Sequence, residues 1–157
     1  MNENPSTKSC WGYEKGACVN IINEHREFST KGTGDLIDIT CEIVETLARS
    51  GLQRGSINVF VQGSTAGITT LEYEPGLIQD VKELYEKMAP SGRTYHHDKT
   101  WGDANGFSHL RATMSGQSFT FPFESGRPLL GAWQQVVLAE FDNRPRKRLV
   151  IVQMIGE

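Results

Sequence analysis

The stretch Ser118-Phe119-Thr120-Phe121-Pro122-Phe123 decides the fold class, because an aromatic ring stands at every second position. Side chains that alternate in this way lie on one face of a β-strand. Two further strands are predicted after it, at 133–141 and 149–155, and the turn Asp142-Asn143-Arg144-Pro145 separates them. The segment 149–155 is apolar on both faces, which is typical of a central strand. The chain from residue 117 onward is therefore predicted to be all-β.

The preceding part of the chain contains two amphipathic helical patterns as well as strands. The first predicted helix begins near Asp35 and ends before Gly51, with apolar residues at helical spacing: Leu36, Ile39, Ile43 and Leu47. The second spans 77–89, and Pro90 follows it. Strands are predicted at 17–29, 56–62 and 68–72. Strands and helices without strict alternation favour an α+β domain with a mixed, largely antiparallel sheet and two main helices.

Two segments have less pattern than the rest. Residues 91–106 are polar and are predicted to form a long ordered loop, which is uncommon unless it serves a site. Residues 109–114 fit a short helix or a strand equally well. No repeat or linker divides the chain, so residues 1–157 are predicted to form one compact domain, with a polar tail at 1–16.

The overall composition excludes several classes of protein. A formal net charge of −3 argues against a general nucleic-acid binder, which needs a basic excess. No apolar run is long enough to span a bilayer, and the first twenty residues contain no signal-peptide core, so no membrane association and a cytoplasmic location are expected. The three cysteines, Cys10, Cys18 and Cys41, give no disulfide framework and are expected to be free thiols.

The polar segment 95–109 is the strongest candidate site. It contains three of the four histidines, and imidazole both titrates near neutral pH and is the commonest metal ligand. Asp103 and Asn105 lie between His97 and His109 and could orient the rings or add oxygen ligands. The spacing matches no standard zinc motif. An acid–base site, a metal site and a loop held together by hydrogen bonds all stay open at this point.

Other polar features are weaker candidates. The small-residue turn 63–67 follows a strand, and its backbone N–H groups with the hydroxyls of Ser64 and Thr65 could bind an anion, although a plain tight turn is the simpler interpretation. Trp133 and Gln134 offer a flat apolar wall and an amide, unless Trp133 belongs to the core.

Charged residues supply two more candidates. Four cations near a hairpin tip could receive phosphate or form a solvated turn: Arg144, Arg146, Lys147 and Arg148. Glu72 could act as an acid, a base or a ligand, although surface carboxylates are common.

The motifs taken together, in this order, resemble the YjbQ-like family. The matching pieces are the small-residue turn with Glu72, the segment 95–98, Asp103-x-Asn105-x-x-x-His109, Gly116-x-Ser118 and Leu130-Gly131-x-Trp133-Gln134. The resemblance covers roughly residues 20–155. It implies a compact α+β subunit in a homotrimer, with weak thiamine-phosphate synthase activity. That transferase reaction joins a hydroxymethylpyrimidine pyrophosphate to a thiazole phosphate and releases pyrophosphate.

This reaction gives the candidate residues expected roles. The expected catalytic residues are His97, His109, Asp103, Asn105 and Glu72. The expected substrate-binding residues are Ser64, Thr65, Trp133, Gln134 and Arg148. His97 and His109 are the expected ligands of a divalent metal, either Mg²⁺ or Zn²⁺. The expected partner is a small phosphorylated metabolite.

One departure from the family pattern bears on the metal. Many members carry His-Thr-Thr-Ala where this chain has Gly63-Ser64-Thr65-Ala66, so this chain supplies only two of three histidines. A third ligand would be water, a carboxylate such as Asp103, or a group from a neighbouring subunit. Two alternatives to the synthase therefore stand: a metal-assisted hydrolase with water bound between His97, His109 and Asp103, and a non-catalytic, metabolite-binding trimer.

Overall fold

The computed structural model describes residues 18–157, so the predicted polar tail at 1–16 and Cys10 lie outside the described residues. The strands are β1 (Asn20–Ser29), β2 (Asp35–Asp38), β3 (Arg54–Gln62), β4 (Ala66–Leu71), β5 (Ser118–Glu124), β6 (Arg127–Pro128), β7 (Gln135–Glu140) and β8 (Lys147–Gly156). The helices are α1 (Thr40–Ser50), α2 (Pro75–Met88), α3 (His96–Trp101) and α4 (Gly106–Ser115). The elements confirm the predicted α+β class.

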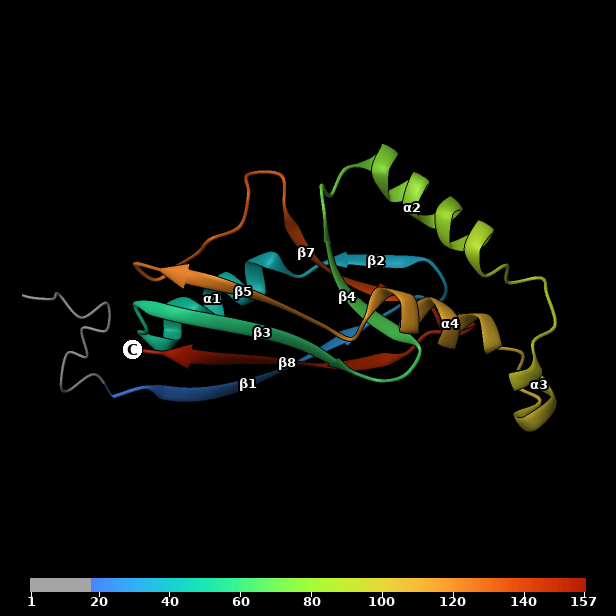
Figure 1. Ribbon diagram of the computed structural model, residues 1–157, viewed down its shortest axis with the longest axis horizontal. Helices are drawn as coiled ribbons and strands as arrows, with labels where there is room; N and C mark the ends of the chain where they lie inside the picture. Colours follow the sequence, from blue (N-terminus) through green and yellow to red (C-terminus); the bar gives the residue numbers. More distant parts are fainter. Residues whose placement is uncertain (1–17) are drawn as a thin grey trace, which may run out of the picture.

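The strands form two antiparallel sheets (Figure 1). One has five strands in the order β1-β8-β3-β5-β6, and the other has three in the order β2-β7-β4. The segment 149–155 lies in β8 between β1 and β3, which confirms the predicted central strand. The alternating phenylalanine stretch forms β5, whose Phe121 and Phe123 are buried.

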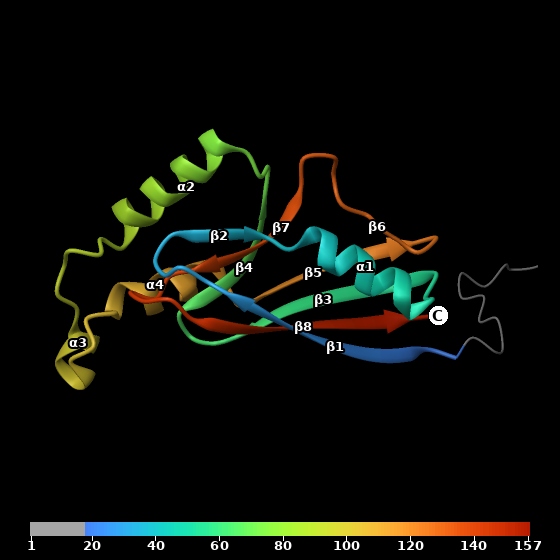
Figure 2. The ribbon, with the colours of Figure 1, turned by 180° about the vertical axis from the view of Figure 1, so that it is seen from behind.

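Strand β7 contributes to two separate cores because its side chains alternate between faces. Val136 and Leu138 pack into the larger core, which the five-stranded sheet and α1 enclose. Val137 and Ala139 belong to a smaller core on the opposite face, together with Leu36 and residues of α2 and α4. Figure 2 shows α1 lying across the sheets at the end opposite to α3. The predicted residues His97 and His109 lie in α3 and α4, so the candidate site is at the end of the molecule opposite to α1.

The prediction that the first helix begins near Asp35 is wrong. Residues 35–38 form β2, in which Leu36 pairs with Ala139 of β7, and α1 begins only at Thr40. The spacing of Leu36 and Ile39 fits a helix, but it also fits a strand that buries one residue in each core. The Thr40 hydroxyl donates to Oδ1 of Asp38 at 2.5 Å and marks the change from strand to helix.

The polar loop predicted at 91–106 contains a helix, α3, which Gly102 ends in a left-handed conformation. Residues 109–114 lie in α4 and so are helical. The described residues therefore contain two more helices than the two predicted. The short α3 was missed because six residues do not establish a 3.6-residue pattern. No helix between residues 18 and 157 has the length and apolar character to cross a membrane.

Helix α2 lies on the outside of the molecule (Figures 1 and 2). It begins at Pro75, earlier than the predicted residue 77, and the Glu74 carboxylate accepts a hydrogen bond from the Gly76 N–H at 2.7 Å. None of its residues is fully buried. Leu84 and Met88 are 52% and 55% exposed, so part of its apolar face is left uncovered by residues 18–157.

Candidate functional site

Helices α3 and α4 meet through the carboxylate of Asp98. Its Oδ2 accepts from the Tyr95 N–H at 2.8 Å and its Oδ1 accepts from the Gly106 N–H at 2.9 Å. These hydrogen bonds hold the pKa of Asp98 below its usual range. Gly106 permits the close approach, because a Cβ there would lie 2.5 Å from the Cβ of Tyr95. The starts of the two helices are therefore fixed against each other.

This junction brings two predicted residues together, His97 from α3 and His109 from α4. Their ring centroids lie 4.3 Å apart and the ring planes are inclined by 45°. The rings line a pocket of about 300 Å³, which we call the histidine pocket. It is lined by Tyr95, His96, His97, Gly106, His109 and Leu110. Two groups capable of proton transfer thus face one small volume.

The two predicted polar residues between the histidines lie beside His97, although neither lines the pocket. Oδ1 of Asp103 is 3.8 Å from Nε2 of His97. With its amide oriented by its neighbours, Asn105 donates to both Asp103 oxygens at 3.1 and 3.2 Å. Asn105 is buried while Asp103 is exposed, so the amide anchors the carboxylate beside His97.

Burial lowers the pKa of His109, and the charge of His97 lowers it further. The carboxylates of Asp103 and Asp142 act in the opposite direction but do not outweigh these two causes. His109 is therefore a neutral base near pH 7.

Asp142 was not among the predicted residues, yet its charge acts on His109 and it is part of the turn between β7 and β8. It is buried, and its Oδ2 accepts from Nε of Arg146 at 2.7 Å and from the Thr65 hydroxyl at 3.2 Å. The neighbouring Asn143 donates to the Asp103 carbonyl at 2.8 Å and ties the histidine segment to this turn. The sequence contained a signal for this role, because Asp142 directly follows a strongly apolar strand and a charge buried there needs a partner.

Arg148 and Thr65, predicted to bind substrate, take part in a buried network. Nε of Arg148 donates to Oε2 of Glu140 at 2.6 Å, and its Nη2 donates to the Thr65 hydroxyl at 2.7 Å. Only Nη1 of Arg148 has no hydrogen-bond partner among residues 18–157. A Cβ at Gly63 would lie 2.9 Å from that nitrogen, and Ser64 is exposed on the same turn.

The other predicted residues lie elsewhere. Glu72 follows the last residue of β4, and Gln134 donates to Thr70 of that strand at 3.3 Å. Trp133 is 73% exposed on the loop before β7. Gly67 near the start of β4 contacts Ser115 at the end of α4, and Glu72 lies five residues further along, which is roughly 17 Å at about 3.3 Å per residue. Both ribbon views place the β6–β7 loop away from α3 (Figures 1 and 2).

A divalent metal does not fit the side chains that residues 18–157 of one chain supply. No group of three His, Cys, Asp or Glu side chains among the described residues is arranged to hold an ion. The two imidazoles contact each other, and Gly63, where the resemblance implies a third histidine in other members, lies next to the Arg148 guanidinium. A cation at that place opposes a bound metal ion. The predicted metal ligands His97 and His109 would need a partner from outside the described residues.

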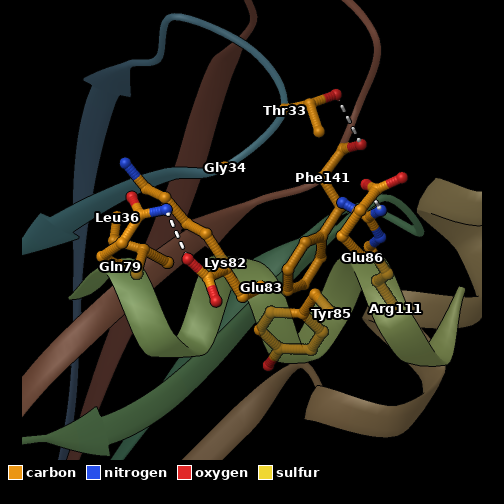
Figure 3. Close-up of a pocket in the computed structure, with 10 residues that line it drawn as sticks. All are labelled: Thr33, Gly34, Leu36, Gln79, Lys82, Glu83, Tyr85, Glu86, Arg111 and Phe141. Atoms are coloured by element: carbon orange, nitrogen blue, oxygen red, sulfur yellow. Dashed lines mark hydrogen bonds and ion pairs between the residues drawn. The ribbon is translucent and has the colours of Figure 1, made fainter. Parts of the chain in front are cut away.

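A separate pocket of about 300 Å³ lies between α2 and the loop before β2 (Figure 3). Tyr85 and Phe141 form its aromatic wall, with ring centroids 4.7 Å apart. Two of its charged groups pair with each other, because Arg111 donates to Glu86 at 2.5 Å, and Arg111 also donates to the Ala89 carbonyl at 2.7 Å. It contains none of the predicted site residues, so the histidine pocket is the stronger candidate.

Comparisons with known proteins agree with this fold. A model of the family described as UPF0047 protein YjbQ-like matches residues 24–157. A UPF0047 protein of Archaeoglobus fulgidus is 38% identical over 122 residues, which cover 77% of this chain and 91% of the relative. A UPF0047 protein of Methanothermobacter thermautotrophicus is 34% identical over 142 residues, which cover 90% of this chain and 97% of the relative.

A solved structure of a similar protein has the same fold. The crystal structure of a YbjQ-like protein of unknown function from Sulfolobus solfataricus superimposes with a TM-score of 0.84 at 30% identity, and the match covers 89% of this chain and all of that one. The chain therefore belongs to the UPF0047 family of YjbQ-like proteins.

Proposed function

We propose that this protein is an enzyme that acts on a phosphorylated small molecule, with its reaction centre in the histidine pocket. The observation that carries the proposal is the contact between His97 and His109 inside a pocket beside Asp103. Two imidazoles next to one carboxylate form an arrangement that can exchange protons with a bound substrate. The activity that we expect is a weak thiamine-phosphate synthase reaction, which is a transfer to a thiazole phosphate with loss of pyrophosphate.

The two histidines have different environments, which favours different roles. His109, whose pKa is lowered by burial, is suited to accept a proton or to bind as a neutral ring. His97 lies 3.8 Å from a carboxylate oxygen of Asp103 and has a counter-ion when it is protonated. We assign His97 to the leaving pyrophosphate, to which it can donate a charge-assisted hydrogen bond. Asn105 is a positioning residue that acts through Asp103.

Single substitutions test the proposal. His97→Ala and His109→Ala should each abolish formation of thiamine phosphate from the pyrimidine pyrophosphate and the thiazole phosphate. Both variants should unfold at the wild-type temperature within a few degrees. His25→Ala is the matched control, because that histidine is exposed on β1 and lies outside the pocket. Unchanged turnover in either pocket variant would reject the scheme.

We also propose that three copies assemble. The support in the chain is an exposed apolar surface on α2 and α4, formed by Leu84, Met88, Leu110 and Met114. Large apolar patches on soluble proteins usually mark interfaces. Light scattering coupled to size-exclusion chromatography should give the mass of a trimer, and Met88→Glu should reduce it to that of a monomer. A monomeric wild type would refute this part.

The alternatives predict different measurements. A metal-assisted hydrolase requires stoichiometric metal in the purified protein, and added Zn²⁺ or Mn²⁺ should then raise its rate. A non-catalytic trimer would retain a metabolite unchanged when it is incubated with a metabolite pool and analysed by mass spectrometry. The cytoplasmic location stays a prediction, which cell fractionation tests.

A further inference from the structure

A second, smaller pocket lies directly beside the histidine pocket. It has a volume of about 190 Å³ and is lined by Arg93, Thr94, Tyr95, His96 and Lys99. We call it the cationic pocket. Tyr95 and His96 line both pockets, so the two cavities adjoin across these residues. Their combined size falls within the roughly 300–1,000 Å³ that small-molecule sites usually occupy.

The charge of the cationic pocket is not balanced by any carboxylate that the structure describes. None of its lining residues is acidic. Among residues 18–157, the side chains of Arg93, Thr94, His96 and Lys99 make no hydrogen bond and no ion pair. The carboxylate nearest in sequence, Asp98, accepts from the backbone N–H groups of Tyr95 and Gly106 instead.

The aromatic wall of this pocket is fixed, whereas its polar groups are available. The Tyr95 hydroxyl donates to the Pro90 carbonyl at 2.9 Å, which holds the ring in place. The Arg93 guanidinium lies over that ring, 5.4 Å from its centroid, with no carboxylate bound. A guanidinium, an ammonium, an imidazole and a hydroxyl around one cavity match the acceptor oxygens of a phosphate group.

We propose that the cationic pocket is the phosphate subsite of the enzyme. The ligand class is a phosphate or diphosphate ester of a small molecule, whose anionic group contacts Arg93 and Lys99 while its organic part reaches His97 and His109. The inference rests on the proposed function and locates the anionic group of the same substrate. It also explains how a phosphate can bind although Arg148 is engaged with Glu140 and Thr65.

Calorimetric titration with phenyl phosphate, and with phenol as its uncharged analogue, tests this subsite. The wild-type protein should bind phenyl phosphate and not phenol, and more weakly at higher salt. Arg93→Ala and Lys99→Ala should each weaken binding by about tenfold or more, as expected when one charge-assisted hydrogen bond is lost. Arg49→Ala removes the same charge from α1, at the other end of the molecule, and should leave the affinity unchanged.

The possible outcomes separate the subsite from the proposed function. Affinity that is unchanged in both Arg93→Ala and Lys99→Ala overturns the subsite and leaves the proposed function standing. Weakened binding in both, without turnover of the pyrimidine and thiazole substrates by the wild type, supports the subsite and overturns the proposed activity. A wild-type protein that binds no phenyl phosphate overturns the subsite, and the turnover assay with the pyrimidine and thiazole substrates then decides the proposed function independently. Circular dichroism of each variant verifies that the fold is retained.

Discussion

Arg148 and Glu140 form a two-pronged ion pair whose side chains are only 8% and 0% exposed. Removing one partner leaves the other charge buried without compensation. Arg148→Ala should therefore lower the free energy of unfolding by about 3–5 kcal/mol, measured by urea denaturation. The exposed pair between Arg54 and Glu157 is the control, because Arg54→Ala should cost less than about 1 kcal/mol. Equal costs for the two pairs would contradict the assigned burial.

The lowered pKa of His109 makes stability depend on pH. Below the pKa of about 6.5 that histidine has in an unfolded chain, the unfolded state binds a proton that the folded site disfavours. Stability is thus fully present above this pH and decreases as the pH falls toward the lower folded value. The loss between pH 7.5 and 5.5 should be smaller in His109→Gln than in the wild type, as measured by denaturation at both pH values. An identical loss in both proteins would argue against this burial.

At the scale of elements, the junction of α3 and α4 depends on Gly106. A methyl group there would meet the Cβ of Tyr95 at 2.5 Å, so Gly106→Ala should push α3 away and separate the two imidazoles. The expected cost is about 1–3 kcal/mol of stability, together with most of the turnover. Gly92→Ala is the control, because open space surrounds that position. Histidine ring contacts observed by NMR should disappear in the first variant and persist in the second.

The elements that could be predicted from sequence are those with a clear period. The phenylalanines of β5 and the two-faced apolar run of β8 place these strands without ambiguity. The strand β2 could not be predicted, because its four residues continue the apolar spacing of the helix that follows. Only the pairing with β7 makes them a strand. The short α3 is fixed by the Asp98 hydrogen bonds rather than by an apolar stripe.

At the scale of the whole molecule, the exposed Trp133 does not line the histidine pocket, and the β6–β7 loop that carries it lies away from α3 (Figure 1). In the proposed trimer, the Trp133 loop of one subunit can complete the pocket of the next. Trp133→Ala and His109→Ala should each be inactive alone, whereas mixed trimers refolded from both should recover part of the activity. Mixtures that stay inactive would show that the two groups do not combine.

His97 and His109 were predicted to belong to one site from the order of the motifs, because no hydrophobic period in the sequence places their rings. Asp142 and the buried pair of Arg148 with Glu140 were not foreseen in their observed roles. Composition counts charges but does not tell which are buried, and a run of cations near a turn is usually solvated. Here Arg146, Lys147 and Arg148 each find a carboxylate from another position in the chain.

Gly63 leaves room for a guanidinium that is held in place at its other nitrogens. A histidine introduced there would collide with Nη1 of Arg148, and the bidentate pairing with Glu140 prevents the arginine from moving aside. Gly63→His should therefore displace either the guanidinium or the turn at 63–67, so a change at this one position should disturb the buried pair that joins β7 to β8.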